Sequence, residues 1–225
     1  MKLLNWLLDL LYPPKCMLCR KLLDSGRQTV CPACLDSLPD YDGAEPTVRF
    51  AQRCIATFFY REPLRGAILR YKFSGSRAYA AQFGQWMAVT IRDKLAGEYD
   101  MISWVPVSRK RRRTRGYDQA ELLCRAAADA LGCTAVRTLT KTDDNPPQST
   151  LADASMRAAN VRGVYQAYRP EDFAGRRILL IDDIVTTGST LSECCRVLLT
   201  AGASGIVCAA LAAPERDPQK KGEHE

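Results

Sequence analysis

One stretch decides the fold of this chain: Ile178-Leu179-Leu180-Ile181-Asp182-Asp183-Ile184-Val185-Thr186-Thr187-Gly188-Ser189-Thr190. Its apolar run lacks the period-2 alternation of a strand with one wet face, which predicts a strand covered on both faces in a parallel sheet. Thr190-Leu191-Ser192-Glu193 fits a capping box, and apolar residues follow at helical spacing, so we expect a helix to begin at Thr190. The stretch therefore predicts a strand, a turn and a helix of an α/β protein.

The turn and the two acidic residues before it predict a ligand site. Backbone N–H groups at such a turn favour a phosphate, and Gly188 lets the backbone approach closely. Ionised Asp182 and Asp183 only accept hydrogen bonds, so they suit a sugar diol or a Mg²⁺ that the ligand brings. The element can therefore hold a ribose 5-phosphate unit. The residues expected around its phosphate are Thr186, Thr187, Gly188, Ser189 and Thr190.

Two other interpretations of this stretch stay open from the residues alone. The Asp pair could be solvated at the end of an ordinary strand, or the strand could be the Walker-B-like strand of an ATPase. The ATPase interpretation is disfavoured because no G-x-x-x-x-G-K-[ST] motif occurs in the chain.

Length and composition indicate one domain with an appendage, because the chain has 225 residues of which 47% are hydrophobic. The net charge of +7 is modest and does not by itself predict a nucleic-acid partner. Residues 1–11 are apolar but too short to span a bilayer, and no small-residue cleavage site follows them. Ten cysteines without a secretory signal indicate a reducing compartment, so we expect a cytoplasmic protein without a transmembrane segment.

Residues 1–45 are expected to form a zinc module. Two C-x-x-C pairs can bind one structural Zn²⁺ through four thiolates, namely Cys16, Cys19, Cys31 and Cys34. Redox pairs or buried free thiols are the alternatives. The leucines of residues 3–11 predict an amphipathic helix, which packs either on the protein itself or on a membrane or partner. Residues 36–53 have the composition of a linker.

Strand and helix patterns alternate through residues 54–213, which predicts a doubly wound parallel sheet. Ligands of such sheets bind beyond the carboxyl ends of the strands, where Asp182 lies. Residues 214–225 are expected to be a disordered tail. We predict strands at 54–60, 101–105, 134–139, 164–168, 177–181 and 205–211, and helices at 64–70, 78–95, 120–131 and 190–201.

Two further segments are candidates for the same site. The run 109–115 carries six basic residues in seven and follows a predicted strand, so it is either a solvated loop or an anion site at the edge where Asp182 lies. The polar loop 140–162 is either a plain surface loop or a lid that excludes water. The residues of interest in that loop are Lys141, Arg157 and Asn160.

Residues 178–190 resemble the phosphoribosyl-pyrophosphate (PRPP) loop of type I phosphoribosyltransferases. The resemblance implies that Asp182 and Asp183 bind the ribose hydroxyls, that residues 186–190 surround the 5′-phosphate, and that Mg²⁺ enters with PRPP. It also implies that the loop 140–162 is the flap of such enzymes. The residues that would hold pyrophosphate are Val107, Ser108, Arg109, Arg113 and Arg115.

More of the chain, residues 3–213, is similar to the ComF family of competence-associated, phosphoribosyltransferase-like proteins. The resemblance rests on the Cys₄ module and on four motifs: Tyr71-Lys72-Phe73, Val105-Pro106-Val107, Arg115-Gly116-Tyr117-Asp118-Gln119 and Gln148…Arg157-x-x-Asn160-Val161-x-Gly163. One departure is Tyr-Asp at 117–118, where the usual pattern has Phe-Asn. The resemblance implies a link to DNA uptake in natural transformation.

Two functions follow from these observations. The chain could transfer ribose 5-phosphate from PRPP to an acceptor that the sequence does not identify, as a glycosyltransferase of the pentosyl-transferring kind. Alternatively, it could be a non-catalytic accessory that binds single-stranded DNA, in which the PRPP site is a sensor or a relic and a competence helicase or uptake protein is a partner. The expected DNA contacts are Lys110, Arg111, Arg112 and Tyr117, with the other cations of 109–115 and with Lys21 and Arg27.

Overall fold

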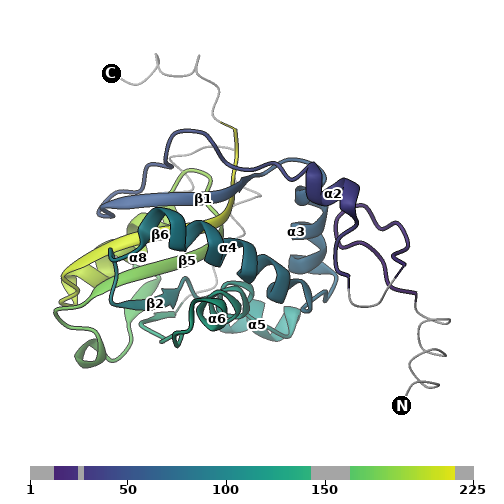
Figure 1. Cartoon of the computed structure of the whole chain (residues 1–225). Coiled ribbons are helices and arrows are strands. Elements are labelled where there is room, and N and C mark those ends of the chain that lie inside the picture. The colour runs from purple at the N-terminus through teal and green to yellow at the C-terminus, as the bar shows by residue number, and fades with distance from the viewer. Residues whose placement is uncertain (1–12, 25–27, 143–162, 216–225) are drawn as a thin grey trace, which may run out of the picture.

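A four-stranded parallel sheet lies at the centre of the protein, with its strands in the order β1-β6-β5-β2 (Figure 1). The computed structural model describes residues 13–24, 28–142 and 163–215. The parallel sheet confirms the predicted α/β fold. Its strands are β1 (Arg53–Phe59), β2 (Met101–Trp104), β5 (Arg177–Ile184) and β6 (Gly205–Ala213).

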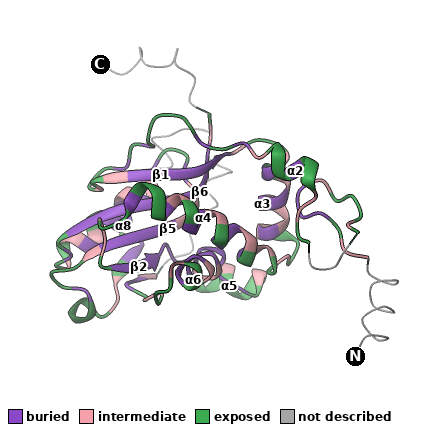
Figure 2. Cartoon of the chain, in the orientation of Figure 1, coloured by how far each residue is buried: buried purple, intermediate pink, exposed green. Residues whose placement is uncertain are grey.

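Helices cover both faces of this sheet, which is why its strands are buried along most of their length (Figure 2). In β5, Leu179 and Ile181 pack in one core cluster, whereas Ile178 and Leu180 pack in a second. All four side chains are fully buried, as the non-alternating apolar run predicted. The main-domain helices that pack in the first cluster are α3 (Leu64–Phe73), α4 (Tyr79–Leu95) and α6 (Gln119–Leu131), and α8 (Ser189–Thr200) packs in the second.

The strand predicted at 134–139 is wrong in its extent. Only Ala135 pairs with the parallel sheet, through a single bridge to Ile102. The chain then turns away to form β3 (Leu139–Lys141), which pairs antiparallel with β4 (Tyr165–Ala167). The fully buried Leu139 packs in the cluster on the α8 side, so burial of this side chain favours the second pairing.

The amino-terminal module packs onto the main domain instead of standing apart from it. Met17 and Leu18 are almost fully buried and belong to the same core cluster as Leu64 and Ile68 of α3. Arg70 of α3 donates hydrogen bonds to the carbonyl oxygens of Met17 and Leu18, at 2.7 and 2.8 Å. The module contains the short helix α2 (Pro32–Asp36), which lies beside α3 in Figure 1.

The segment predicted to be a linker is also packed. Asp40 forms an antiparallel bridge with Phe58 of β1, and Tyr41 is buried against the ring of Phe59. Residues 36–53 therefore extend the edge of the domain. The prediction failed because Pro and Gly mark turns without indicating whether the residues between them are buried.

Some predictions fall outside the described residues: the helix within 1–11 and most of the tail 214–225. Across 13–24, 28–142 and 163–215, no helix is both long and apolar enough to cross a membrane. The remaining regular elements are α5 (Arg109–Arg115) and the 3₁₀ turn η2 (Pro170–Asp172).

Candidate phosphoribosyl site

The two predicted acidic residues, Asp182 and Asp183, lie at the carboxyl end of β5, and Asp183 pairs with a lysine of helix α3. The Lys72 Nζ lies 2.8 Å from Asp183 Oδ2, and both side chains are mostly buried, at 18% and 15% exposed. Lys72 belongs to the last turn of α3, which is over a hundred residues away in the chain. The site therefore has a built-in cation that balances one of its two carboxylates.

Asp182 lies in the same group of charges but has a different environment. Its Oδ1 accepts a hydrogen bond of 2.8 Å from the backbone N–H of Asp183. Burial, and then repulsion by the Asp183 carboxylate, raise the pKa of Asp182 to about 8, although that N–H and Lys72 act in the opposite direction. Near neutral pH this carboxyl can therefore exchange a proton when a cation or a diol binds.

The turn after β5 leads into α8 through a glycine. Gly188 is the N-cap with a left-handed φ of 73°, so the N-cap position has no side chain, and Thr187 Oγ1 of the turn accepts from the Ser189 N–H at 3.4 Å. The predicted capping box at Thr190–Glu193 is therefore wrong, and α8 begins at Ser189. Thr186 and Thr187 are exposed, and the Thr187 and Ser189 hydroxyls lie 2.9 Å apart. Exposed hydroxyls beside a helix start are suited to an anion.

A segment from the supposed linker supports this turn. A Cβ built on Gly188 would lie 2.5 Å from the backbone oxygen of Thr47, so only glycine fits there. The backbone N–H of Arg49 donates to Ser192 Oγ at 2.9 Å, and Ser192 Oγ donates to the Gly188 carbonyl at 2.8 Å. Residues 47–49 thus fix the turn from outside the strand-turn-helix unit.

The basic run is a helix and not the loop that was predicted. Ser108 is the N-cap of α5 and its hydroxyl accepts from Arg111 N–H, while Gly116 ends the helix in the left-handed conformation. Helix formation by seven mostly cationic residues depends on these two caps, because the like charges themselves disfavour it. Arg109 and Arg113 are exposed, whereas Arg115 is half-buried.

Arg115, the last residue of the basic run, interacts electrostatically with Asp183 of the acidic pair. Burial lowers the pKa of Arg115, and the Asp183 carboxylate partly opposes this. Arg115 Nη1 donates to Gln119 Oε1 at 2.9 Å. Val107 and Ser108 lie on the backbone between β2 and α5, and Val107 N–H donates to Asp118 Oδ2 at 2.9 Å.

Asp118, the residue that departs from the usual family pattern, holds this backbone in place. It is 4% exposed, caps α6 by accepting from Glu121 N–H at 3.1 Å, and also accepts from Val107. The two contacts use different carboxylate oxygens, Oδ2 for Val107 and Oδ1 for Glu121, whereas Asn has only one acceptor oxygen. Burial raises the pKa of Asp118, but the two backbone donors act against this.

The prediction that Tyr117 stacks on a base is wrong. Tyr117 is 6% exposed, its hydroxyl donates to the Tyr71 carbonyl, and the Arg77 guanidinium lies 4.8 Å from its ring centroid. Tyr71 donates in turn to the Gln119 carbonyl at 2.7 Å. Tyr117 thus joins α3 to the start of α6. Its position within a motif did not indicate that its side chain is buried.

Of the flap candidates, only Lys141 is described, whereas Arg157 and Asn160 lie outside the described residues. Lys141 ends β3, and its Nζ lies 3.3 Å from the Tyr165 hydroxyl across the β3–β4 pair. On the other side of the loop, Gly163 N–H donates to Glu193 Oε1 of α8 at 2.9 Å. Lys141 thus contacts β4 and Gly163 contacts α8, so the two residues that border the loop are both held by the described structure.

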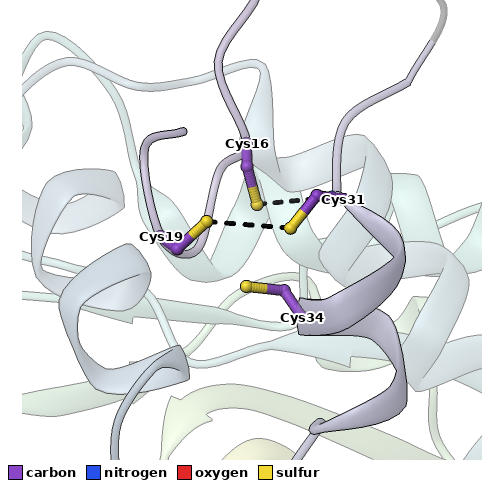
Figure 3. A group of neighbouring side chains, drawn as sticks. All are labelled: Cys16, Cys19, Cys31 and Cys34. Atoms are coloured by element: carbon purple, nitrogen blue, oxygen red, sulfur yellow. Dashed lines mark hydrogen bonds between the residues drawn. The ribbon is translucent and has the colours of Figure 1, made fainter. Parts of the chain in front are cut away.

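The four module cysteines meet as predicted. The Sγ atoms of Cys16, Cys19, Cys31 and Cys34 all lie within 4.8 Å of one another (Figure 3). Burial alone would raise the pKa of Cys16, but backbone N–H groups, that of Cys31 foremost, lower it to about 6. Four convergent thiols on two knuckles fit tetrahedral Zn²⁺, which thiolates would hold without an open coordination position.

Two residues of the site were missed by sequence reasoning. Lys72 belongs to a quoted motif, but no local pattern pairs it with Asp183. Glu193 was assigned to a capping box, yet it is 7% exposed and binds Gly163 and Arg196. The signal for Glu193 was its position among the apolar residues of an amphipathic helix, because an acidic side chain that is buried there usually has a partner.

Comparisons with known proteins agree with this division of the chain. A model of the double zinc ribbon domain matches residues 7–46, and a model of the phosphoribosyl transferase domain matches residues 118–225. The DNA utilization protein YhgH of Escherichia coli (strain K12) is 28% identical over 219 residues, which cover 86% of this chain and 94% of that protein. Competence protein F of Haemophilus influenzae is 25% identical over 215 residues, which cover 85% of this chain and 93% of that protein.

The matches extend across both modules, and the fold has the parallel sheet and the Cys₄ cluster that they require. Over most of its length the chain is therefore similar to proteins of the ComF family, with a phosphoribosyl transferase domain that follows an amino-terminal double zinc ribbon.

Proposed function

We propose that this chain is a cytoplasmic protein that binds PRPP with Mg²⁺ and acts in the handling of DNA during uptake. The observation that carries the proposal is the pair Asp182 and Asp183 at the end of β5, directly before a turn with exposed hydroxyls and a helix whose N-cap is a glycine. In this proposal the carboxylates accept from the ribose hydroxyls. Residues 186–190 bind the 5′-phosphate, and Zn²⁺ is structural.

The charges around the pair suit the pyrophosphate end of such a ligand. Lys72 and Arg115 both lie near Asp183 and supply positive charge at the edge of the site. Mg²⁺ bound with PRPP would neutralise developing charge on a leaving pyrophosphate. Release of pyrophosphate from PRPP would mark the chain as a transferase, and binding without release would mark a sensor.

A thermal-shift measurement tests the proposal, because a ligand of the native state raises the melting temperature. PRPP with Mg²⁺ should stabilise the wild type and should leave the Asp182→Ala/Asp183→Ala variant unchanged. Asp129→Ala, an exposed position on α6, is the matched control and should keep the full shift. Equal stabilisation of the double variant would refute the assignment of the diol site.

A second function, binding of single-stranded DNA, is favoured by the exposed cations of α5. The exposed members are Arg109, Lys110, Arg112 and Arg113, so one helix presents four cations to solvent. The names of the relatives, which refer to DNA utilization and competence, support this proposal. A helicase or another uptake protein is the partner that we propose for this role.

Salt dependence tests this second function. Affinity for a single strand should fall with salt at a log–log slope of about −0.7 per neutralised phosphate. Alanine at Arg111, Arg112 and Arg113 should weaken binding and flatten the slope. A control variant that loses the same charge elsewhere carries alanine at Arg61, Arg65 and Arg92. If both triple variants behave alike, net charge and not α5 governs binding.

A further inference from the structure

An aromatic side chain at the mouth of the candidate site has no role so far. Phe73 is the last residue of α3 and is 64% exposed, although phenylalanine is usually buried. The residue before it, Lys72, turns inward to Asp183. The exposed ring therefore stands next to the cation that balances the acidic pair, at the edge where ligands of a parallel sheet bind.

A guanidinium supports this ring. Arg115 Cζ lies 4.9 Å from the centroid of the Phe73 ring, and Gln119 holds the same guanidinium at 2.9 Å. Arg115 is half-buried, and its hydrogen bond to Gln119 and its contact with the Phe73 ring limit the freedom of its guanidinium. A planar aromatic face that is supported by a positive charge is suited to stacking with another flat ring.

The surrounding charge indicates which ring this platform would take. Arg115 is the last residue of α5, whose exposed cations continue the positive surface away from the ring. A free base carries no phosphates for these cations, and a mononucleotide carries too few. A single strand offers both a base for the ring and a row of phosphates for the helix.

We propose that Phe73 and Arg115 form a stacking platform for a base of single-stranded DNA at the mouth of the phosphoribosyl site. This inference rests on the DNA-binding function proposed above. It assigns the stacking role to a ring that is exposed, where Tyr117 is buried. A strand that is held in this way passes beside Lys72 and Asp183, so DNA and PRPP occupy neighbouring parts of one surface.

Oligonucleotides that differ only in their bases test the platform. The probes are a labelled oligo-dT and an abasic strand of the same length, measured by fluorescence anisotropy at low salt. Phe73→Leu keeps an apolar side chain but removes the ring, so it should weaken binding of oligo-dT at least about five-fold, the lower end of what stacking contributes. Binding of the abasic strand should not change, because the phosphate contacts remain.

Three controls make the result specific. Phe73→Trp should restore oligo-dT binding, since the stacking face is retained. Val89→Ala alters another exposed apolar residue, on α4, and should have no effect. The PRPP-dependent thermal shift should be the same in Phe73→Leu and wild type, which also shows that the variant is folded.

The possible outcomes separate the platform from the function on which it rests. If the wild type binds oligo-dT but Phe73→Leu binds it equally well, the platform is wrong and DNA binding stands. If the wild type binds neither strand at low salt, both proposals fail. If Phe73→Leu loses binding of free thymidine monophosphate as strongly as binding of oligo-dT, the platform serves a small nucleotide and the assignment to DNA is overturned.

Discussion

Asp182→Asn should make the protein more stable at high pH while it removes the proposed ligand site. Asn keeps the oxygen that accepts from Asp183 N–H and resembles the protonated carboxyl in size. It lacks the negative charge that is repelled by Asp183 and disfavoured by burial. A residue that lowers the stability of its protein is expected where the residue serves a function.

The sign and the size of the effect follow from the pKa of Asp182. Its ordinary value is 3.8 and its value in the folded protein is about 8, so the folded state holds a proton that the unfolded state releases between these values. Stability from this group is complete below pH 4 and is lost as pH rises through 8. One pKa unit corresponds to about 1.4 kcal/mol. Because the side chain keeps some contact with water, we expect a smaller difference than the full shift implies, about 1–3 kcal/mol.

Thermal and urea unfolding at pH 5 and pH 9 measure the effect. The variant and the wild type should be nearly equal at pH 5, and at pH 9 the variant should melt roughly 2–10 °C higher. Asp129→Asn, at an exposed position, controls for the general loss of a negative charge and should show no such pH dependence. A variant that is equally stable or less stable than wild type at pH 9 would show that Asp182 is not held near its neutral form.

Three other changes test the remaining parts of the structure. Cys31→Ser should lose the zinc that elemental analysis finds in the wild type, since three thiolates remain, and a full complement in the variant would contradict the Cys₄ site. Arg70→Ala should cost about 2 kcal/mol in urea unfolding because two buried carbonyls lose a charged donor, whereas the exposed Arg65→Ala should stay within about 0.5 kcal/mol. Gly188→Ala should lower the stability of the protein in urea unfolding more than Gly132→Ala does. Both positions have φ near 73°, but of the two only a Cβ at Gly188 meets a backbone oxygen. Equal losses of stability would show that the clash at Gly188 is relieved.

The sequence predicts the features that depend on neighbours in the chain. The buried strand β5 was predictable because an apolar run of that length without alternation needs cover on both faces, and the zinc site because two C-x-x-C pairs bring their own ligands together. The acidic pair and the hydroxyl-rich turn were predictable for the same reason, since one strand-turn-helix unit carries them all.

The features that the sequence did not predict depend on distant contacts or on single turns of backbone. The helical state of the basic run is decided by Ser108 and Gly116 at its ends, whereas its like charges predict a loop. The start of α8 is decided by Gly188, which takes the N-cap with a left-handed φ and sets aside the capping box. Lys72 could not be assigned because its partner Asp183 comes from another part of the chain.

These distant contacts meet on the last turn of α3, which connects the zinc ribbon to the candidate ligand site. Residues two apart in a helix point to nearly opposite sides, since each residue rotates by about 100°. Arg70 therefore holds the backbone of the ribbon while Lys72 pairs with Asp183, and between them Tyr71 binds the start of α6. A displacement of α3 would move all three contacts together. The described part of the ribbon holds this helix through Arg70, so the position of Lys72 beside the acidic pair depends on the ribbon as well.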